Sequence, residues 1–130
     1  MTRLVVLLSR NRRSANALRR IGPGDRTGAL ADALVQSRLA SDTTALVFIT
    51  SLTERTAFKY GEAGYRFALV EAGHMAQNLA LAATGLGLGA VTVGGFFHRA
   101  VDAILGLDGL SHSTLYVVAL GGRSGTNWMA

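Results

Sequence analysis

Residues 58–79 read Phe-Lys-Tyr-Gly-Glu-Ala-Gly-Tyr-Arg-Phe-Ala-Leu-Val-Glu-Ala-Gly-His-Met-Ala-Gln-Asn-Leu, and this stretch decides the fold because it leads into a long apolar helix. Its second residue, Lys59, is the only lysine in a chain whose 13 basic residues are otherwise all arginine. Arginine stays charged in proteins, whereas the lysine amine can be tuned to exchange a proton. We therefore interpret Lys59 and Tyr60 as an amine and a phenol that can share a proton. The alternative is an exposed lysine beside a packed tyrosine in a loop.

The composition indicates a globular protein with one domain, residues 1–130. Hydrophobic residues make up 49% of the chain, which is too apolar for a disordered protein. The chain has no cysteine, so a disulfide scaffold, thiolate zinc sites and thiol nucleophiles are excluded, and we expect a cytoplasmic protein. The first apolar run, residues 4–8, is too short for a signal peptide.

Two features raise other function classes. Residues 72–97 contain no charged side chain, but Gln77, Asn78 and a series of glycines interrupt the run, so we predict a buried helix followed by a buried strand and no membrane span. The net charge is +5, and arginines cluster in residues 10–20, where nucleic acid, an anionic phosphate or an acidic peptide could bind. The alternative is a solvated turn. No aromatic residue lies among these arginines, so we predict no nucleic-acid partner.

The hydrophobic pattern predicts strands and helices in alternation. Asp25 is placed to cap a helix over residues 26–39, with Leu30, Ala33 and Leu34 facing inward. On the long helix, residues 69, 73, 76, 80 and 83 form one stripe, and the other side is also apolar, so we expect burial within a domain or a dimer. The continuously apolar strand at residues 45–50 is expected to be covered on both faces. The remaining expected elements are strands at residues 3–8, 15–21, 90–93 and 114–120, and helices at residues 64–86 and 97–105.

Glycines and an arginine near the end of the chain are further site candidates. Gly94 and Gly95 follow a predicted strand, where bare backbone would let a flat ligand approach, and the alternative is a tight turn. Arg123 follows the last strand and could bind a phosphate, or could be a surface arginine. Glu71 and His74 have a spacing found in metal sites, but no second pair completes a site, so we predict no metal.

Several of these segments together resemble one family. Residues 54–79, which include Lys59 and Tyr60, are similar to the core motif of the SagB-type dehydrogenases, FMN-dependent members of the nitroreductase superfamily. The resemblance continues through residues 82–90, 93–96 and 105–108, and it closes with residues 115–121. Residues 22–25, Gly-Pro-Gly-Asp, resemble the turn before a family helix.

The resemblance implies an α/β (α+β) fold, in which a mixed sheet packs around a long buried central helix. It implies oxidation of thiazoline and oxazoline rings to azoles in ribosomally made peptides, with FMN as the acceptor and oxygen reoxidising it. Lys59 would be the base and Tyr60 its proton-handling partner. Gly94 and Gly95 would approach the isoalloxazine ring, and Arg123 would contact the FMN phosphate.

The family also implies an oligomer with FMN at the subunit interface. The chain matches only the C-terminal half of the family domain, and the helix that carries an Arg-x-Ser-x-Arg signature is missing. We therefore expect a homo-oligomer, or a hetero-oligomer with a chain that supplies the missing half, acting on a peptide. A second hypothesis is a non-catalytic interaction subunit that binds a partner chain or a precursor peptide. A third is nucleic-acid binding by the basic N-terminal segment, which steep salt dependence would reveal.

Overall fold

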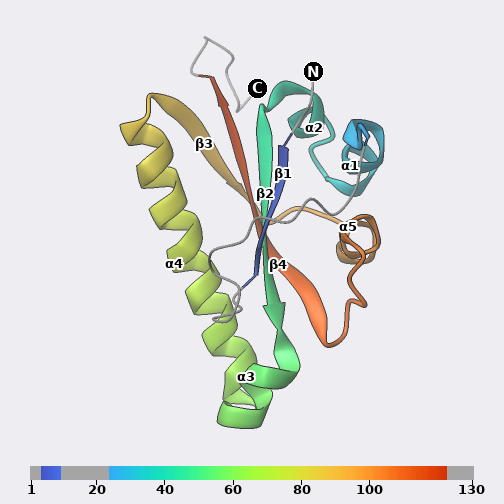
Figure 1. Ribbon diagram of the computed structural model, residues 1–130, viewed down its shortest axis with the longest axis vertical. Coiled ribbons are helices and arrows are strands. Elements are labelled where there is room, and N and C mark those ends of the chain that lie inside the picture. Colours follow the sequence, from blue (N-terminus) through green and yellow to red (C-terminus); the bar gives the residue numbers. More distant parts are fainter. Residues whose placement is uncertain (1–3, 10–23, 123–130) are drawn as a thin grey trace.

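A mixed four-stranded sheet forms the centre of the computed structural model, which describes residues 4–9 and 24–122 (Figure 1). The strand predicted at residues 15–21, the arginines of residues 10–20 and Arg123 lie outside the described residues. In chain order the elements are β1 (Leu4–Ser9), α1 (Thr27–Ala33), α2 (Arg38–Asp42), β2 (Ala45–Leu52), α3 (Thr53–Tyr60), α4 (Ala63–Gly85), β3 (Leu88–Val93), α5 (His98–Leu105) and β4 (His112–Gly122).

The sheet has the strand order β1-β2-β4-β3. β1 runs parallel to β2, whereas β4 runs antiparallel to both of its neighbours, β2 and β3. Helix α4 covers one face, and α1, α2 and α5 cover the other (Figure 1). The predicted α/β class is therefore confirmed. β2 is buried over five consecutive residues, as its apolar sequence predicted, because both of its faces are covered.

Side chains of the two central strands alternate between two hydrophobic clusters. Phe48 and Val117 point toward α1, α2 and α5, where they join Leu30 and Val101. The side chains next to them in sequence, such as Val47 and Val118, join the cluster on the α4 side. This alternation follows from the period of two residues along a strand.

Helix α4 buries only one stripe of its surface within this chain. The buried residues are small and lie mostly four apart, which lets the helix approach the sheet closely: Gly64, Ala68, Ala72, Ala76 and Ala83. Of the predicted stripe at residues 69, 73, 76, 80 and 83, only Ala76 and Ala83 are buried within this chain. The side opposite the buried residues exposes Val70 and Leu81. The described part of this chain therefore buries α4 on one side only.

The single helix predicted at residues 26–39 was wrong. Asp25 does lie at the start of the helix, where its carboxylate accepts the Thr27 N–H at 2.9 Å. Leu30, Ala33 and Leu34 are buried as expected. However, Leu34 is extended and forms an isolated bridge with Phe96, so α1 ends at Ala33. Backbone hydrogen bonds to a segment some sixty residues away thus replace the next helical turn.

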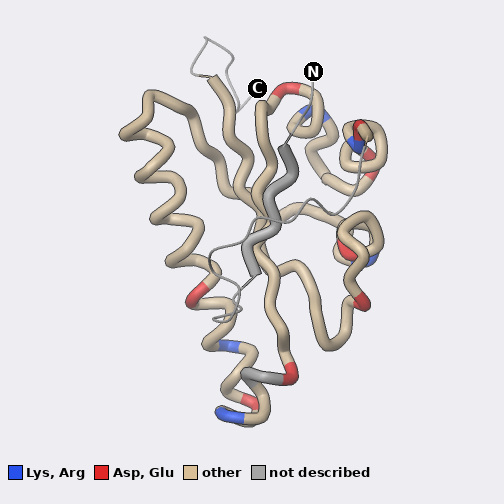
Figure 2. Tube along the Cα trace, viewed as in Figure 1, with Lys and Arg blue, Asp and Glu red and all other residues tan. Residues whose placement is uncertain are grey.

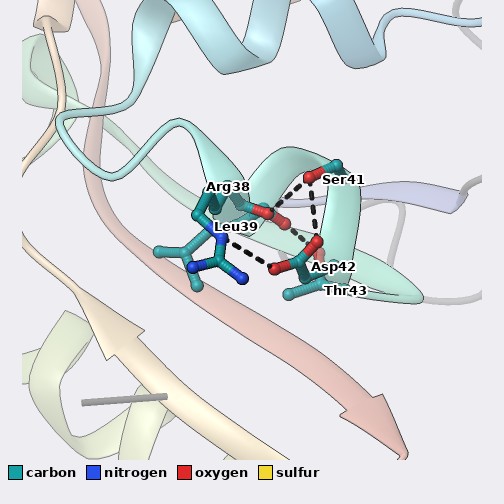
Figure 3. Close-up of polar contacts among 5 residues, drawn as sticks. All are labelled: Arg38, Leu39, Ser41, Asp42 and Thr43. Atoms are coloured by element: carbon teal, nitrogen blue, oxygen red, sulfur yellow. Dashed lines mark hydrogen bonds and ion pairs between the residues drawn. The ribbon is translucent and has the colours of Figure 1, made fainter. Parts of the chain in front are cut away.

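The second short helix, α2, is held by local polar contacts (Figure 3). The Ser41 hydroxyl lies 2.9 Å from the Arg38 carbonyl oxygen and 3.0 Å from the Asp42 carboxylate. Arg38 Nε lies 3.5 Å from the same carboxylate, and the Thr43 hydroxyl donates to the Leu39 carbonyl at 2.6 Å. The two hydroxyls thus add hydrogen bonds to carbonyl oxygens of the same turn, and the Leu39 oxygen also accepts the Thr43 N–H at 3.3 Å.

Two further expectations near the long helix need correction. The alternative interpretation placed Lys59 in a loop, but its segment is helix α3, and a turn at Gly61 (φ 58°) separates it from α4. Glycine adopts this positive φ without the steric cost that a side chain adds. The strand that follows α4 was expected to be buried, yet β3 is an edge strand in which only Val93 is fully buried. Among the described helices, none combines the length and apolar character required to cross a membrane.

Candidate functional site

A groove of about 500 Å³ lies where β3 ends and the first half of β4 continues without it. β3 pairs with β4 only from Val117 onward, so residues 112–116 of β4 have β2 as their single strand neighbour in the described sheet. The groove is lined by residues of four elements and of the loop before β4, including Tyr65, Leu69, Gly94, His98, Asp102 and Leu115. Its volume is in the range typical of small-molecule sites.

A buried carboxylate replaces the strand that is missing beside β4. Asp102 is buried, and its Oδ1 accepts the backbone N–H of Thr114 at 2.8 Å. Gly109 donates its N–H to the His112 carbonyl at 3.0 Å, so a second backbone group of β4 also has a hydrogen-bond partner. Asp102 is therefore used to complete the sheet edge, because a buried N–H without a partner is costly.

Two buried threonines face one another across β2 and β4 and differ in their hydrogen bonding. Thr50 and Thr114 are register partners next to a β-bulge. The Thr50 hydroxyl lies 3.0 Å from His112 Nε2, whereas the Thr114 hydroxyl is buried with no hydrogen-bond partner. Buried hydroxyls usually make a hydrogen bond. The burial of the Thr114 hydroxyl beside the groove therefore costs desolvation free energy that no hydrogen bond offsets.

The two predicted glycines have different surroundings. A Cβ at Gly95 would lie 3.3 Å from Val35 Cβ, and the Gly95 carbonyl accepts the Val35 N–H at 3.0 Å. Gly95 is thus required by the close approach of the α1–α2 connection. Gly94 lines the groove instead, and a Cβ there would meet only the Tyr116 ring, at 3.9 Å. Of the pair, Gly94 is the one that leaves space for a ligand.

Lys59 and Tyr60 lie at the end of α3 and do not line the groove. The Lys59 amine is 5.0 Å from the centre of the Tyr60 ring, and that ring packs edge-to-face on Phe67 with centroids 5.3 Å apart. Lys59 is exposed, and Tyr60 is about half exposed at 46%. The structure therefore keeps the predicted amine and phenol adjacent, but nothing in the described chain removes the amine from water.

The remaining polar candidates are not part of this groove. Arg123 lies outside the described residues. His74, Gln77 and Asn78 are exposed on α4, so they do not need the buried partners that an enclosed helix would require. From the residue after Glu71 to the end of β3, the chain carries no charged residue (Figure 2). The apolar exposed side of α4 is accordingly uncharged over most of its length.

A tight loop closes the groove on the α5 side. The Asp108 carboxylate accepts the N–H groups of Leu110 at 2.8 Å and His112 at 2.9 Å, and it also accepts the Ser111 hydroxyl. Mainly through the Ser111 hydroxyl and then these backbone groups, the pKa of Asp108 is lowered to about 2. An aspartate that bonds the N–H two residues later is a recognised turn signal, which the sequence already contained.

Three groove residues were missed by sequence reasoning, namely Tyr65, His98 and Asp102. Tyr65 lies inside the motif that attracted attention, but only the fold shows that its ring lines the same groove as Gly94. His98 and Asp102 are one helical turn apart on α5, which places them on one face. No local pattern indicated that this face would meet β4, because that contact joins distant segments.

The arrangement suits a flat, partly apolar ligand. Tyr65 and Leu69 provide an apolar wall from α4, and Gly94 provides bare backbone. Among the described residues that line the groove there is no lysine or arginine, so an anionic group of a ligand would need a cation from elsewhere. The predicted base, Lys59, is also outside the groove, on the neighbouring helix α3.

Comparisons with known proteins identify relatives over most of the chain. The profile of the nitroreductase family matches residues 7–122. A candidate nitroreductase of Methanocaldococcus jannaschii, MJ1384, is 45% identical over 60 residues, which are 46% of this chain and 30% of that protein. The crystal structure of a candidate nitroreductase from Anabaena variabilis is 32% identical with a TM-score of 0.69, over 76% of this chain and 20% of that one.

A third relative is part of an assembly. The Escherichia coli microcin synthetase McbBCD complex with truncated pro-MccB17 bound contains a chain that is 33% identical, with a TM-score of 0.56. The match covers 58% of this chain and 29% of that one. The matched regions thus span less than a third of the length of each of these three relatives.

Proposed function

Since this chain belongs to the nitroreductase family, we propose that it is, or forms part of, an FMN-dependent oxidoreductase that oxidises azoline rings to azoles in peptides. The likeness to a chain of the microcin synthetase complex carries the peptide part of this proposal, because that complex was solved with truncated pro-MccB17 bound. The resemblance of residues 54–79 to the SagB-type motif supports the azoline chemistry.

The groove residues fit the ring of a flavin. Flavin binding is typical of the family, and the bare backbone at Gly94 leaves room that a Cβ would fill. We assign Gly94 to direct contact with the flavin ring and Gly95 to holding that backbone against Val35. Arg123 would hold the phosphate, since the part of the groove that the structure describes contains no arginine or lysine.

Oxidation of an azoline removes two hydrogens and leaves a new double bond in the ring. One leaves as a proton, which we assign to the Lys59 amine with Tyr60 as the phenol that shares it. When bound, FMN supplies the acceptor for the hydride, and therefore for both electrons, and oxygen reoxidises the reduced flavin. The exposed amine has to be covered by another surface before it can act as a neutral base, because burial disfavours its charged form.

The exposed apolar side of α4 is the observation that favours binding of a partner chain. Phe67, Val70 and Leu81 are all more than 40% exposed and do not line the groove, so they offer apolar area to another chain. We propose that a second copy, or a different chain that supplies further flavin contacts, packs on this side. Such a partner would also be close enough to cover the end of α3, which packs against the start of α4.

A specific observation favours a second candidate function. Lys59 and Tyr60 do not line the groove that contains Gly94, so the described chain alone does not join the base to the cofactor site. The alternative is a non-catalytic subunit that binds a partner chain or a precursor peptide.

The decisive experiment combines a spectrum, a mass and one substitution. The chain is purified alone and with its partner, and we expect a flavin absorbance spectrum together with a mass above that of one chain. Lys59→Ala should abolish oxidation of an azoline-bearing peptide while the spectrum and mass are unchanged. The alternative predicts no flavin and no oxidation of the peptide, and therefore no effect of Lys59→Ala on any of these measurements. A preparation that never shows flavin, alone or with a partner, would refute the proposed enzyme.

A further inference from the structure

Of the three tyrosines of the chain, Tyr65 is the one that lines the groove. Tyr60 packs on Phe67 and carries the Lys59 amine over its ring, and it does not line the groove. Tyr116 is partly buried against the cluster under α4. The Tyr65 ring lines the groove, is 54% exposed, and has no ring partner among the described residues.

Leu69 extends the surface made by Tyr65. The two residues are four apart on α4, so their side chains lie on one side of the helix, one turn from each other. Leu69 lines the groove and is 42% exposed, so it also offers apolar area to a ligand. Together they form one apolar wall of a groove whose other wall is polar, with His98 and Asp102 on α5.

The polar wall is less available to a substrate. The Asp102 carboxylate is buried and already accepts the Thr114 N–H at 2.8 Å, so it holds the sheet edge. A ring that loses a hydride must lie in contact with the flavin, at about 3–3.5 Å between reacting atoms. It must therefore enter the same groove that Gly94 lines, and the apolar wall is the surface there that can receive a flat ring.

Building on the proposed function, we propose that Tyr65 is a substrate-positioning residue. Its ring, continued by Leu69, packs against the five-membered azoline ring and the side chain next to it in the peptide. The contact is between ring faces and edges, and it does not involve proton transfer, which stays with Lys59 and Tyr60. Contacts of this kind add to affinity beyond the area they bury, so loss of the Tyr65 ring weakens binding about tenfold.

Two substitutions separate positioning from chemistry. Tyr65→Phe keeps the ring and removes the hydroxyl, so KM and kcat stay within about twofold of the original values. Tyr65→Ala removes the ring, so KM rises about tenfold while kcat changes by less than about twofold. Leu86→Ala is the matched control, because Leu86 is an exposed apolar residue at the end of the same helix, 78% exposed, that does not line the groove.

The test uses the full chain in the assembly that it forms, supplied with FMN. Kinetics are measured with a synthetic peptide that carries one methyloxazoline ring. Binding is measured separately, by calorimetric titration with the corresponding oxazole peptide, which is the product and does not react further. We expect about tenfold weaker binding of the oxazole peptide for Tyr65→Ala and unchanged binding for Tyr65→Phe and Leu86→Ala.

The outcomes distinguish this inference from the proposed function. If Tyr65→Ala binds the oxazole peptide as tightly as the original protein, or if Tyr65→Phe loses kcat, the positioning role is overturned. The positioning role also fails if the original protein does not bind the peptide, or if Leu86→Ala weakens binding equally. If binding depends on the Tyr65 ring but no flavin is taken up and no oxidation occurs, the positioning role stands and the proposed enzyme fails.

Discussion

Replacing Thr114 with valine should make the protein more stable. The Thr114 hydroxyl is buried without a hydrogen-bond partner, and valine has nearly the same shape. Removing a buried, unsatisfied polar group recovers its desolvation cost, which is about 1–3 kcal/mol. The backbone N–H of Thr114 still donates to Asp102, so the sheet edge is unaffected.

The neighbouring strand offers a matched control for this substitution. Thr50 is buried, is the register partner of Thr114, and places its hydroxyl 3.0 Å from His112 Nε2. Thr50→Val breaks that bond and should cost about 1 kcal/mol. The higher strand preference of valine is common to both variants, so it does not explain a difference of opposite sign between them.

Thermal unfolding followed by circular dichroism measures both effects. With an unfolding entropy of about 2.1 cal/mol/K per residue, 1 kcal/mol shifts the Tm of a chain of 130 residues by about 4 °C. We expect Thr114→Val to raise the Tm by about 4–11 °C and Thr50→Val to lower it by about 4 °C. If Thr114→Val lowers the Tm as much as Thr50→Val does, the hydroxyl has a partner and the reasoning is wrong.

Two further predictions concern the glycine pair and the Asp108 loop. Gly95→Ala should destabilise the protein by about 1 kcal/mol, because its Cβ would press on Val35 at 3.3 Å, whereas Gly94→Ala should leave the Tm unchanged or slightly higher; equal losses in urea unfolding would contradict this. The pKa of Asp108 is lowered from 3.8 to about 2 on folding, so its stabilising contribution is complete above about pH 4 and is lost as the pH falls toward 2. The stability difference between the original protein and Asp108→Asn should therefore shrink over that interval in unfolding curves recorded at successive pH values, and a constant difference would rule out this role.

Much of the secondary structure could be predicted because it depends on local pattern. The apolar run at residues 45–50 indicated a strand covered on both faces, and β2 is that strand. The long apolar segment with glycines at its end indicated a helix followed by a strand, and α4 and β3 follow in that order. Hydrophobic periodicity and glycine position are properties of neighbouring residues, so they can be read without knowing the fold.

The candidate site could be predicted only in part. Lys59 and Tyr60 were singled out by residue type, and their adjacency is a fact of sequence, but their role stays a prediction. The groove could not be predicted from residues near them, since its walls come from α4, α5, β4 and the end of β3. Tyr65 and Asp102 became candidates only when the fold brought those elements together.

The sequence by itself determined the family motif, the order of most elements and the residues able to exchange a proton. Only the tertiary structure decided that the helix from Thr27 ends at Ala33, because Leu34 and Val35 pair with the segment around Gly95. It also decided that Gly95 is packed while Gly94 is open. The physical reason is that these outcomes depend on hydrogen bonds and contacts between segments far apart in the chain, which local preference is too weak to specify.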